Sequence, residues 1–391
     1  MSPSQEFGAR VCGGASECAG VRAHAGQRLH PCMSRSALRA MHLPGAIPFD
    51  MVTGGALGAH SRVDPASGEQ VCVSYATGGP GQGPPTARHD VWDAQGSLTH
   101  SATIALPAPI MIHDLAITRT HTVLFDMPLT VRIEKAFLDR FLVEYEKDCP
   151  ARLGLLPRHG APEDVVWFDV EAGVVLHAIN AYDREDGCVV VQAFRAVPAT
   201  PSAYIATFTP SFPYQWVLDP STQRCVQEGY LSDVPGEFPN VNPLVHGKHA
   251  RYAYSLGLSS AGGPITAYGS PQESPRFDRL VKFDLDTGSV ADAYEFAHGR
   301  LMVAEPTFVC KVGQERDQAL KAREDDGYVL VLVSDVSSAD TSGGVCEVEA
   351  SFLLVFDAAD LSRGAVAEVK MPEMIPFGLH SEWLPFEGLS H

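Results

Sequence analysis

The sequence has few of the features that mark membrane proteins, nucleic-acid-binding proteins or disulfide-rich proteins. No apolar run approaches the roughly 20 residues that span a bilayer, and no secretory hydrophobic segment opens the chain. Basic residues are scarce: 29 Lys and Arg stand against 47 Asp and Glu, and the net charge of −18 argues against nucleic acid as a partner. The 9 cysteines form no C-x-x-C pair and indicate no disulfide framework. We therefore expect an intracellular protein, in a plastid or the cytoplasm.

Length and composition indicate a large globular domain after an atypical first segment. Of the 391 residues, 45% are hydrophobic and 19% are charged, as is usual for a protein with a substantial core. Residues 1–50 are rich in Gly, Ala, Ser, Arg and Cys, and Glu6 and Glu17 are the only acids before Met41. This composition is typical of a transit peptide and equally of an unstructured start. We assign no fold to this segment and predict one domain over residues 51–391.

One type of turn recurs between short apolar runs from about residue 53 onward. It consists of an Asp followed by a small cluster of Ser, Thr, Gly or Ala. The Asp side chain can accept hydrogen bonds from the backbone of its own turn, and Gly adopts the positive φ that many hairpins need. Each copy therefore predicts a hairpin tip: Asp64–Gly68, Asp93–Gly96, Asp219–Thr222, Asp284–Gly288 and Asp357–Asp360.

Many irregularly spaced hairpins favour an all-β fold of the β-propeller type over a sandwich, which would be unusually large at this length. An amphipathic helix is predicted at residues 133–148, either packed on the outside of the sheets or in contact with a membrane. Long loops are predicted at residues 258–276 and 335–347, where Gly, Ser, Pro and Asp are frequent. The turns are too unevenly spaced to give the number of blades.

Residues 111–130 combine two short apolar strands with an ionisable pair. The runs Leu115–Ile117 and Thr122–Phe125 predict two buried strands joined by a turn at residues 118–121. His113 and Asp114 stand where the first strand begins. An imidazole at the inner end of a buried strand is costly unless another group pairs with it. Such a histidine needs partners from elsewhere in the chain.

Four of the 15 histidines share this context. Each follows small or apolar residues and lies at one end of a predicted strand: His60, His113, His177 and His380. Their wide spacing excludes a local zinc-finger site and suits ligands delivered by separate blades to one axis. The remaining histidines are interpreted as surface residues, as satisfied core residues or as parts of the terminal segments.

Four neutral imidazoles can hold zinc, copper, iron or nickel, and there is no thiolate to favour zinc. With iron(II), such a site leaves one or two positions open for O₂ and substrate. Ligand imidazoles also need an acceptor for their second ring nitrogen. Glu237 and Glu305 lie in apolar surroundings, and each is either such an acceptor or an ordinary loop acid beside a proline. The residue pattern leaves both interpretations open.

Seven motifs in a fixed order make the pattern specific. They are Ala59–Pro65, Met111–Thr118, Arg152–Arg158, Leu176–Tyr182, Gly236–Pro239, Glu305–Phe308 and Pro376–His380. From about residue 53 onward, the chain resembles the carotenoid cleavage oxygenase family, which also contains stilbene-cleaving enzymes.

The resemblance implies a seven-bladed β-propeller with a non-haem Fe(II) on its axis. The implied iron ligands are the four histidines, and Glu237 and Glu305 are implied to accept hydrogen bonds from them. The implied reaction cleaves one conjugated carbon–carbon double bond with O₂ and gives two carbonyl products, with no catalytic residue beyond the iron ligands. The implied substrate is an apolar conjugated molecule. Relatives that use carotenoids usually contact the membrane from one side without spanning it.

Two departures from the family pattern keep other functions open. Residues 1–50 do not resemble the strands that the family has before the first histidine motif, so we expect an incomplete N-terminal blade with exposed sheet edges. A third glutamate behind the ligands normally comes from that region, and so does a residue beside the free iron position. Leu176 stands where an aromatic residue often precedes the third histidine. The alternatives to a carotenoid or apocarotenoid dioxygenase are a stilbene- or phenylpropanoid-cleaving dioxygenase and a catalytically degenerate propeller that binds an apolar ligand or a protein.

Overall fold

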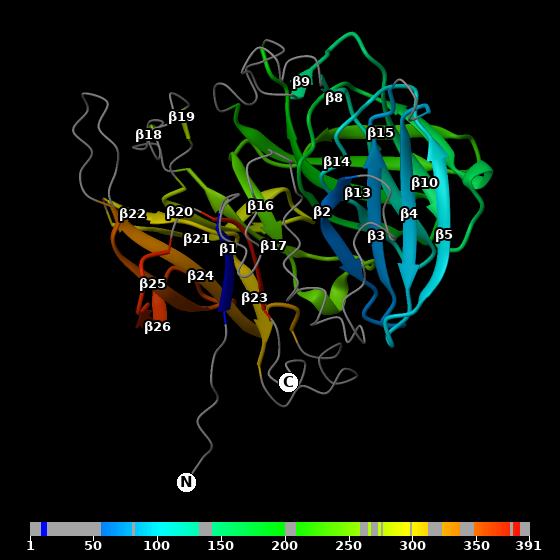
Figure 1. Cartoon of the computed structure of the whole chain (residues 1–391). Helices are drawn as coiled ribbons and strands as arrows, with labels where there is room; N and C mark the ends of the chain where they lie inside the picture. Colours follow the sequence, from blue (N-terminus) through cyan, green and yellow to red (C-terminus); the bar gives the residue numbers. More distant parts are fainter. Residues whose placement is uncertain are drawn as a thin grey trace.

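In the residues that the computed structural model describes, the regular secondary structure is almost entirely antiparallel sheet (Figure 1). The structure describes residues 9–13, 56–79, 83–132, 143–199, 209–258, 265–266, 273–274, 277–297, 299–311, 323–336, 348–375 and 378–383. Within these ranges the helical elements are two three-residue 3-10 turns, Pro162–Asp164 and Pro243–Val245. None of the described helical segments is long and apolar enough to cross a bilayer. The predicted all-β fold of the propeller type is confirmed.

Five large sheets follow one another along the chain. The first contains β2 (Ala56–Val63), β3 (Gln70–Ala76), β4 (Thr86–Trp92) and β5 (Leu98–Ala105). The second contains β6 (Ala116–Ile117), β7 (His121–Asp126), β10 (Ala151–Pro157) and β11 (Val166–Val170). The third contains β12 (Ala178–Asp183), β13 (Val189–Ala196), β14 (Ser211–Asp219) and β15 (Arg224–Tyr230).

The fourth sheet contains β16 (Gly236–Asn240), β17 (Tyr252–Gly257), β20 (Arg279–Asp284) and β21 (Ser289–Glu295). In the fifth sheet, β22 (Arg300–Met302) and β23 (Thr307–Cys310) both pair with β24 (Gly327–Val336). Next in this sheet, β24 pairs with β25 (Val348–Asp357), and β25 pairs with β26 (Ala365–Lys370). Three small ribbons complete the described strands: β1 (Ala9–Gly13) with β27 (Gly378–Trp383), β8 (Leu129–Val131) with β9 (Val143–Tyr145), and β18 (Ile265–Thr266) with β19 (Glu273–Ser274).

Successive sheets pack face to face, as the blades of a propeller do. One apolar cluster joins the first sheet to the second, through Val71 and Val91 on one side and Ile117 and Leu124 on the other. The corresponding clusters between later sheets contain Phe125 and Trp216, then Phe194 and Phe283, then Tyr254 and Phe356. The first strands of neighbouring sheets also meet, since β6 contacts β12 and β12 contacts β16. This arrangement places the first strand of each sheet closest to a common centre.

The predicted hairpin tips all connect paired antiparallel strands, so this prediction is confirmed. The Asp side chains cap their turns as expected. Asp64 Oδ1 accepts a hydrogen bond from Ala66 N at 2.7 Å, and Asp93 Oδ1 accepts one from Ser97 N at 2.8 Å. The two strands predicted within residues 111–130 are also present, as β6 and β7, and Ala116 pairs with Val123 across them.

Two other predictions need correction. The helix predicted at residues 133–148 does not extend to its expected end, because Val143–Tyr145 is the strand β9 and pairs with β8. Residues 133–142 lie outside the described part of the chain. Cross-strand pairing with Leu129–Val131 overrides the helical spacing of apolar residues there. The first 50 residues, to which no strand was assigned, contain β1, whose pairing with β27 is a long-range contact that local sequence does not reveal.

Candidate metal centre

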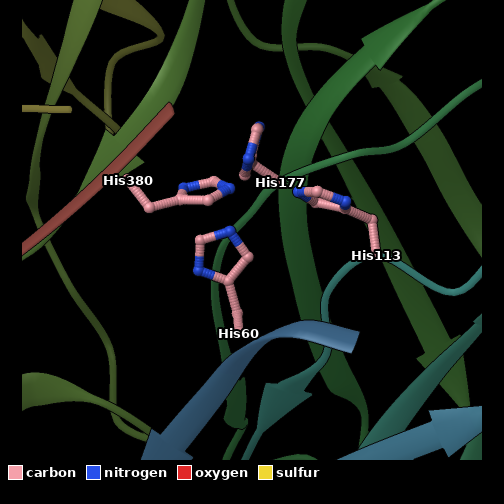
Figure 2. A group of neighbouring side chains, drawn as sticks. All are labelled: His60, His113, His177 and His380. Atoms are coloured by element: carbon pink, nitrogen blue, oxygen red, sulfur yellow. The ribbon is translucent and has the colours of Figure 1, made fainter. Parts of the chain in front are cut away.

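Four histidine side chains from distant parts of the chain meet at the centre of the molecule. His60 comes from β2, His113 and His177 come from the segments just before β6 and β12, and His380 comes from β27 (Figure 2). One ring nitrogen of each lies within 4.8 Å of the corresponding nitrogen of every other. The ring centroids are separated by 4.3 Å for His60 and His380 and by 5.5 Å for His113 and His380. The structure thus brings together all four predicted ligands.

An irregular stretch of strand aims His60 at this centre. Leu57 pairs with Ser74 and Ser61 pairs with Cys72, so four steps along β2 match two steps along β3. Such a bulge leaves residues unpaired and bends the strand, which re-aims a side chain. The backbone of the bulge is then bound to the neighbouring ligand segment, because Ala59 N donates a hydrogen bond to His113 O at 2.8 Å.

A similar irregularity follows His177. Ala178 pairs with Ala193 and Asn180 pairs with Gln192, so β12 has one extra residue beside the ligand. The carbonyl of His177 accepts a hydrogen bond from Phe194 N at 3.1 Å, which fixes the backbone of the ligand on β13. His177 is more enclosed than His380, with 3% of its side chain exposed, compared with 15% for His380.

The inward nitrogens of the cluster have the chemistry that a metal ion needs. Nε2 of His60, of His113 and of His177 is buried, and no described residue offers any of them a hydrogen bond. A buried imidazole nitrogen without a partner is costly, and a bound cation would relieve that cost at all three positions. Four imidazoles without a thiolate or carboxylate suit iron, copper, zinc or nickel. The donor set therefore fits the metal that the sequence predicts, and the identity of the metal stays a prediction.

Glu237 holds His177 from behind. Its Oε2 lies 2.6 Å from His177 Nδ1, and its Oε1 accepts a hydrogen bond from Ser211 Oγ at 3.1 Å. An imidazole whose Nδ1–H donates to a carboxylate presents the lone pair of Nε2 on its opposite side. Glu237 is 5% exposed, and its role as an acceptor for a ligand imidazole matches its predicted position. The alternative of an ordinary loop acid does not fit this contact.

Glu305 lies behind His380 with a different geometry. Its Oε2 is 3.5 Å from His380 Nδ1, a distance for an ion pair, and Nδ1 of His380 has no hydrogen-bond partner among the described residues. The other carboxylate oxygen accepts a hydrogen bond from Ser381 N at 2.9 Å, and Ser381 Oγ donates to the backbone oxygen of Glu305 at 2.8 Å. Glu305 thus fixes the backbone next to the ligand more directly than it fixes the ring.

Burial favours the neutral form of three of the ligand imidazoles. It lowers the pKa of His60, of His113 and of His177 well below the usual value, and the neighbouring histidines lower each pKa further. Burial also raises the pKa of Glu237 to about 7, against the opposing effect of the hydrogen bond from Phe238 N. A neutral imidazole is the form that binds a metal, so these three histidines need not lose a proton when a cation binds.

Phe238 is a neighbour of the cluster that sequence reasoning missed. Its ring lies 4.5 Å from that of His177 and 5.6 Å from that of His380, centroid to centroid. Its backbone has a φ of 54°, which is rare for a bulky residue and marks strain that the surroundings must hold. The Gly236–Pro239 motif contained Phe238, but only its glutamate was assigned a role.

Most of the other histidines within the described part of the chain occupy the places expected of them. His159 and His249 have about half of their side chains exposed, at 50% and 51%. His89 is a core histidine, fully buried and paired with Thr122 Oγ1 at 3.0 Å. His246, predicted on the surface from its polar neighbours, is instead half-buried, and burial followed by the charge of Arg62 lowers its pKa to about 3.

Comparison with known proteins identifies the family. The family model described as retinal pigment epithelial membrane protein matches residues 37–385 of the chain. The chain belongs to this family of carotenoid cleavage oxygenases. Among its curated relatives, a carotenoid 9,10(9',10')-cleavage dioxygenase 1 from Phaseolus vulgaris is 26% identical over 365 residues. An apocarotenoid-15,15'-oxygenase from Synechocystis is 27% identical over 351 residues.

Solved structures of the family share the fold. A lignostilbene dioxygenase from Pseudomonas brassicacearum superposes with a TM-score of 0.70 at 27% identity, and the match covers 87% of this chain and 68% of that one. The cobalt-substituted Synechocystis oxygenase gives a TM-score of 0.67 at 27% identity, covering 84% of this chain and 65% of that one. The sequence match covers 88% of this chain but 61% of the Phaseolus relative, and 85% of this chain but 64% of the Synechocystis relative.

Proposed function

We propose that this protein is a non-haem Fe(II)-dependent dioxygenase that cleaves a conjugated carbon–carbon double bond of a carotenoid or apocarotenoid. The observation that carries the proposal is the cluster of four imidazoles, three of which have a buried, unpartnered Nε2, in a chain of this family. The names of the relatives support the substrate class. The existence of a cobalt-substituted form of the Synechocystis homologue supports a divalent transition metal as the occupant.

Each residue of the centre has a defined part in this proposal. The four imidazoles would hold the ion, and an Fe(II) ion bound there would supply the binding and activation of O₂. Glu237 fixes the ring of His177, and Glu305 fixes the backbone beside His380. Phe238 lies against the rings of both His177 and His380.

The reaction balances without a proton donor or acceptor from the protein. The carbon–carbon double bond and the O–O bond break, and each new carbonyl takes one oxygen atom of O₂. All atoms and electrons come from the substrate and O₂, so no external reductant is consumed. This agrees with a centre in which the two carboxylates beside ligand imidazoles are already engaged, Glu237 with the ring of His177 and Glu305 with the backbone N–H of Ser381.

A second candidate is the cleavage of a hydroxylated stilbene. The structural similarity to a lignostilbene dioxygenase supports it, since that enzyme and the carotenoid-cleaving relatives share one fold. The two candidates differ in the shape and polarity of the substrate and share the same metal chemistry. A direct comparison of the two substrate classes therefore separates them.

The test compares the wild-type chain with two histidine variants. The chain is loaded with Fe(II) without oxygen, its iron content is measured, and isotopically labelled O₂ is supplied with either an apocarotenal or a 4-hydroxystilbene. We expect about one iron per chain and two carbonyl products, each with one labelled oxygen. His113→Ala should lose both iron and product, and His249→Ala, which removes a half-exposed imidazole, should keep both.

Several outcomes would contradict the proposal. Product formed equally well by His113→Ala would exclude the cluster as the reaction centre. A wild-type chain that binds an apocarotenal, contains no iron and forms no product with labelled oxygen would instead indicate a binding protein. Turnover of the stilbene alone would leave the metal chemistry in place and replace the substrate class.

A further inference from the structure

A buried carboxylate next to the centre is bound to several backbone segments at once. Asp114 Oδ2 accepts hydrogen bonds from Arg62 Nη2 at 2.6 Å and from Ala178 N at 2.8 Å. Asp114 Oδ1 accepts one from Leu115 N at 2.7 Å. Arg62 Nη2 also donates to the backbone oxygen of Ala178 at 3.3 Å. The pair thus forms a small network in which a charged donor and two backbone amides share one carboxylate.

Each partner in this network lies beside a candidate metal ligand. Asp114 follows His113 directly, Ala178 follows His177 directly, and Arg62 stands two residues after His60. We propose that Asp114, paired with Arg62, is a positioning residue that holds three of the four ligand segments at the spacing a metal ion requires. This inference rests on the proposed metal binding and concerns the residues that make it possible.

The burial of the pair favours this role over that of a chance surface contact. The side chain of Asp114 is 1% exposed and that of Arg62 is 16% exposed. A charged pair in such a place is weak evidence for stability, because taking both groups out of water offsets most of their attraction. Its value is geometric: Arg62 and Ala178 approach the carboxylate from two other ligand-bearing segments, so neither segment can move without breaking a short charge-assisted hydrogen bond.

The fourth ligand segment is held separately. Ser381 follows His380 directly, and its backbone N–H donates to Glu305 at 2.9 Å, as Ala178 N–H donates to Asp114. The same device, a buried carboxylate that accepts the N–H of the residue after a ligand, therefore occurs twice around the centre. Asp114 binds the segments of His60, His113 and His177, and Glu305 binds the segment of His380.

The test measures metal affinity separately from stability. Asp114→Asn keeps the shape of the side chain but turns an –NH₂ group toward Arg62 or a backbone N–H, so at least one hydrogen bond is lost. Titration of the metal-free protein with Co(II), followed by visible absorption, should show affinity lower than wild type by roughly 10- to 100-fold. The Co(II) spectrum should also change, because the ligands no longer share one fixed geometry.

Asp126→Asn is the matched control. Asp126 is also a buried aspartate paired with an arginine, with Arg152 Nε at 3.0 Å from its Oδ2, but among the described residues its side chain bonds to Arg152, which is not next to a ligand histidine. We expect it to lower the thermal midpoint of the metal-free protein about as much as Asp114→Asn does, while Co(II) affinity stays within about twofold of wild type. Arg62→Lys keeps the positive charge but replaces the rigid, planar guanidinium with a compact ammonium on a flexible stem. It should give an intermediate loss of Co(II) affinity and serves if Asp114→Asn does not fold.

The outcomes separate this inference from the proposed function. Equal Co(II) affinity and identical spectra for wild type, Asp114→Asn and Arg62→Lys would overturn the positioning role and leave the metal site intact. A wild-type chain that binds neither Co(II) nor Fe(II) would overturn the metal site itself. A selective loss in the Asp114 and Arg62 variants, with normal binding by Asp126→Asn, is the result that supports the inference.

Discussion

Acidification from about pH 7 to about pH 5 should cost the fold about 2 kcal/mol through His89 alone. His89 lies in β4, its side chain is fully buried, and its Nε2 pairs with Thr122 Oγ1 at 3.0 Å. Burial, reinforced by His100, Arg158 and His159, lowers its pKa from 6.5 to about 3. The native state therefore keeps this imidazole neutral throughout the range in which an unfolded chain would protonate it.

The sign and size follow from the two pKa values. Above about pH 6.5 neither state binds the proton, and the contribution of His89 to stability is fully present. Below that value the unfolded state gains a proton that the native state excludes, so stability falls by about 1.4 kcal/mol for each pH unit. pH 5 lies about one and a half pH units below the unfolded pKa, so the loss of stability there is about 2 kcal/mol. The loss stops growing only below about pH 3.

The assay is urea unfolding of wild type and His89→Gln at both pH values, followed by tryptophan fluorescence. The variant loses the hydrogen bond to Thr122 at both pH values, so that loss cancels in the comparison. We expect the stability of wild type to fall by about 2 kcal/mol more than that of His89→Gln between the two conditions. His249→Gln, which removes a half-exposed imidazole, should follow wild type. Equal pH dependence in wild type and His89→Gln would refute the reasoning.

Two further predictions concern the framework around the centre. Lys282→Met removes the Nζ that lies 2.7 Å from the buried carboxylate of Asp325 and leaves Arg323 as the charged partner of that carboxylate. We expect a loss of about 1.5–3 kcal/mol in chemical denaturation, part of which a second substitution, Asp325→Asn, should restore. A double variant as unstable as the sum of the two single losses would contradict this. Gly288→Ala forces a φ of 69° on an L side chain and drives its Cβ into Leu231 O, so it should cost more than about 1 kcal/mol, whereas Gly229→Ala meets no atom within 4 Å and should be nearly neutral.

The hairpins could be predicted from sequence because their signal is local. The Asp at each tip accepts hydrogen bonds from its own turn, as Asp219 does from Ser221 N at 2.9 Å, so the residues that specify the turn lie within a few positions of one another. The strand β9 could not be predicted in the same way. Its apolar spacing fits a helix, and only pairing with β8 selects the strand.

The centre was predictable only in part. The four histidines and the two glutamates were identified from their motifs and from the family resemblance, and the structure places all six together. The role of Phe238 could not be seen, because its unusual φ and its contact with two ligand rings exist only in the folded chain. Asp114 stood out in the sequence as a neighbour of His113, but its bond to Ala178 N depends on how two sheets pack.

The contact between His60 and His380 has a consequence for how the protein is made. Their rings lie 4.3 Å apart, although they belong to the first large sheet and to the strand that follows the fifth. During synthesis His60 emerges long before His380. Contacts between residues so far apart in the sequence form slowly, because the chain loses loop-closure entropy before these contacts stabilise it. A metal ion that needs all four imidazoles can bind only after β27 has docked. Uptake of the proposed metal should therefore report the completion of folding.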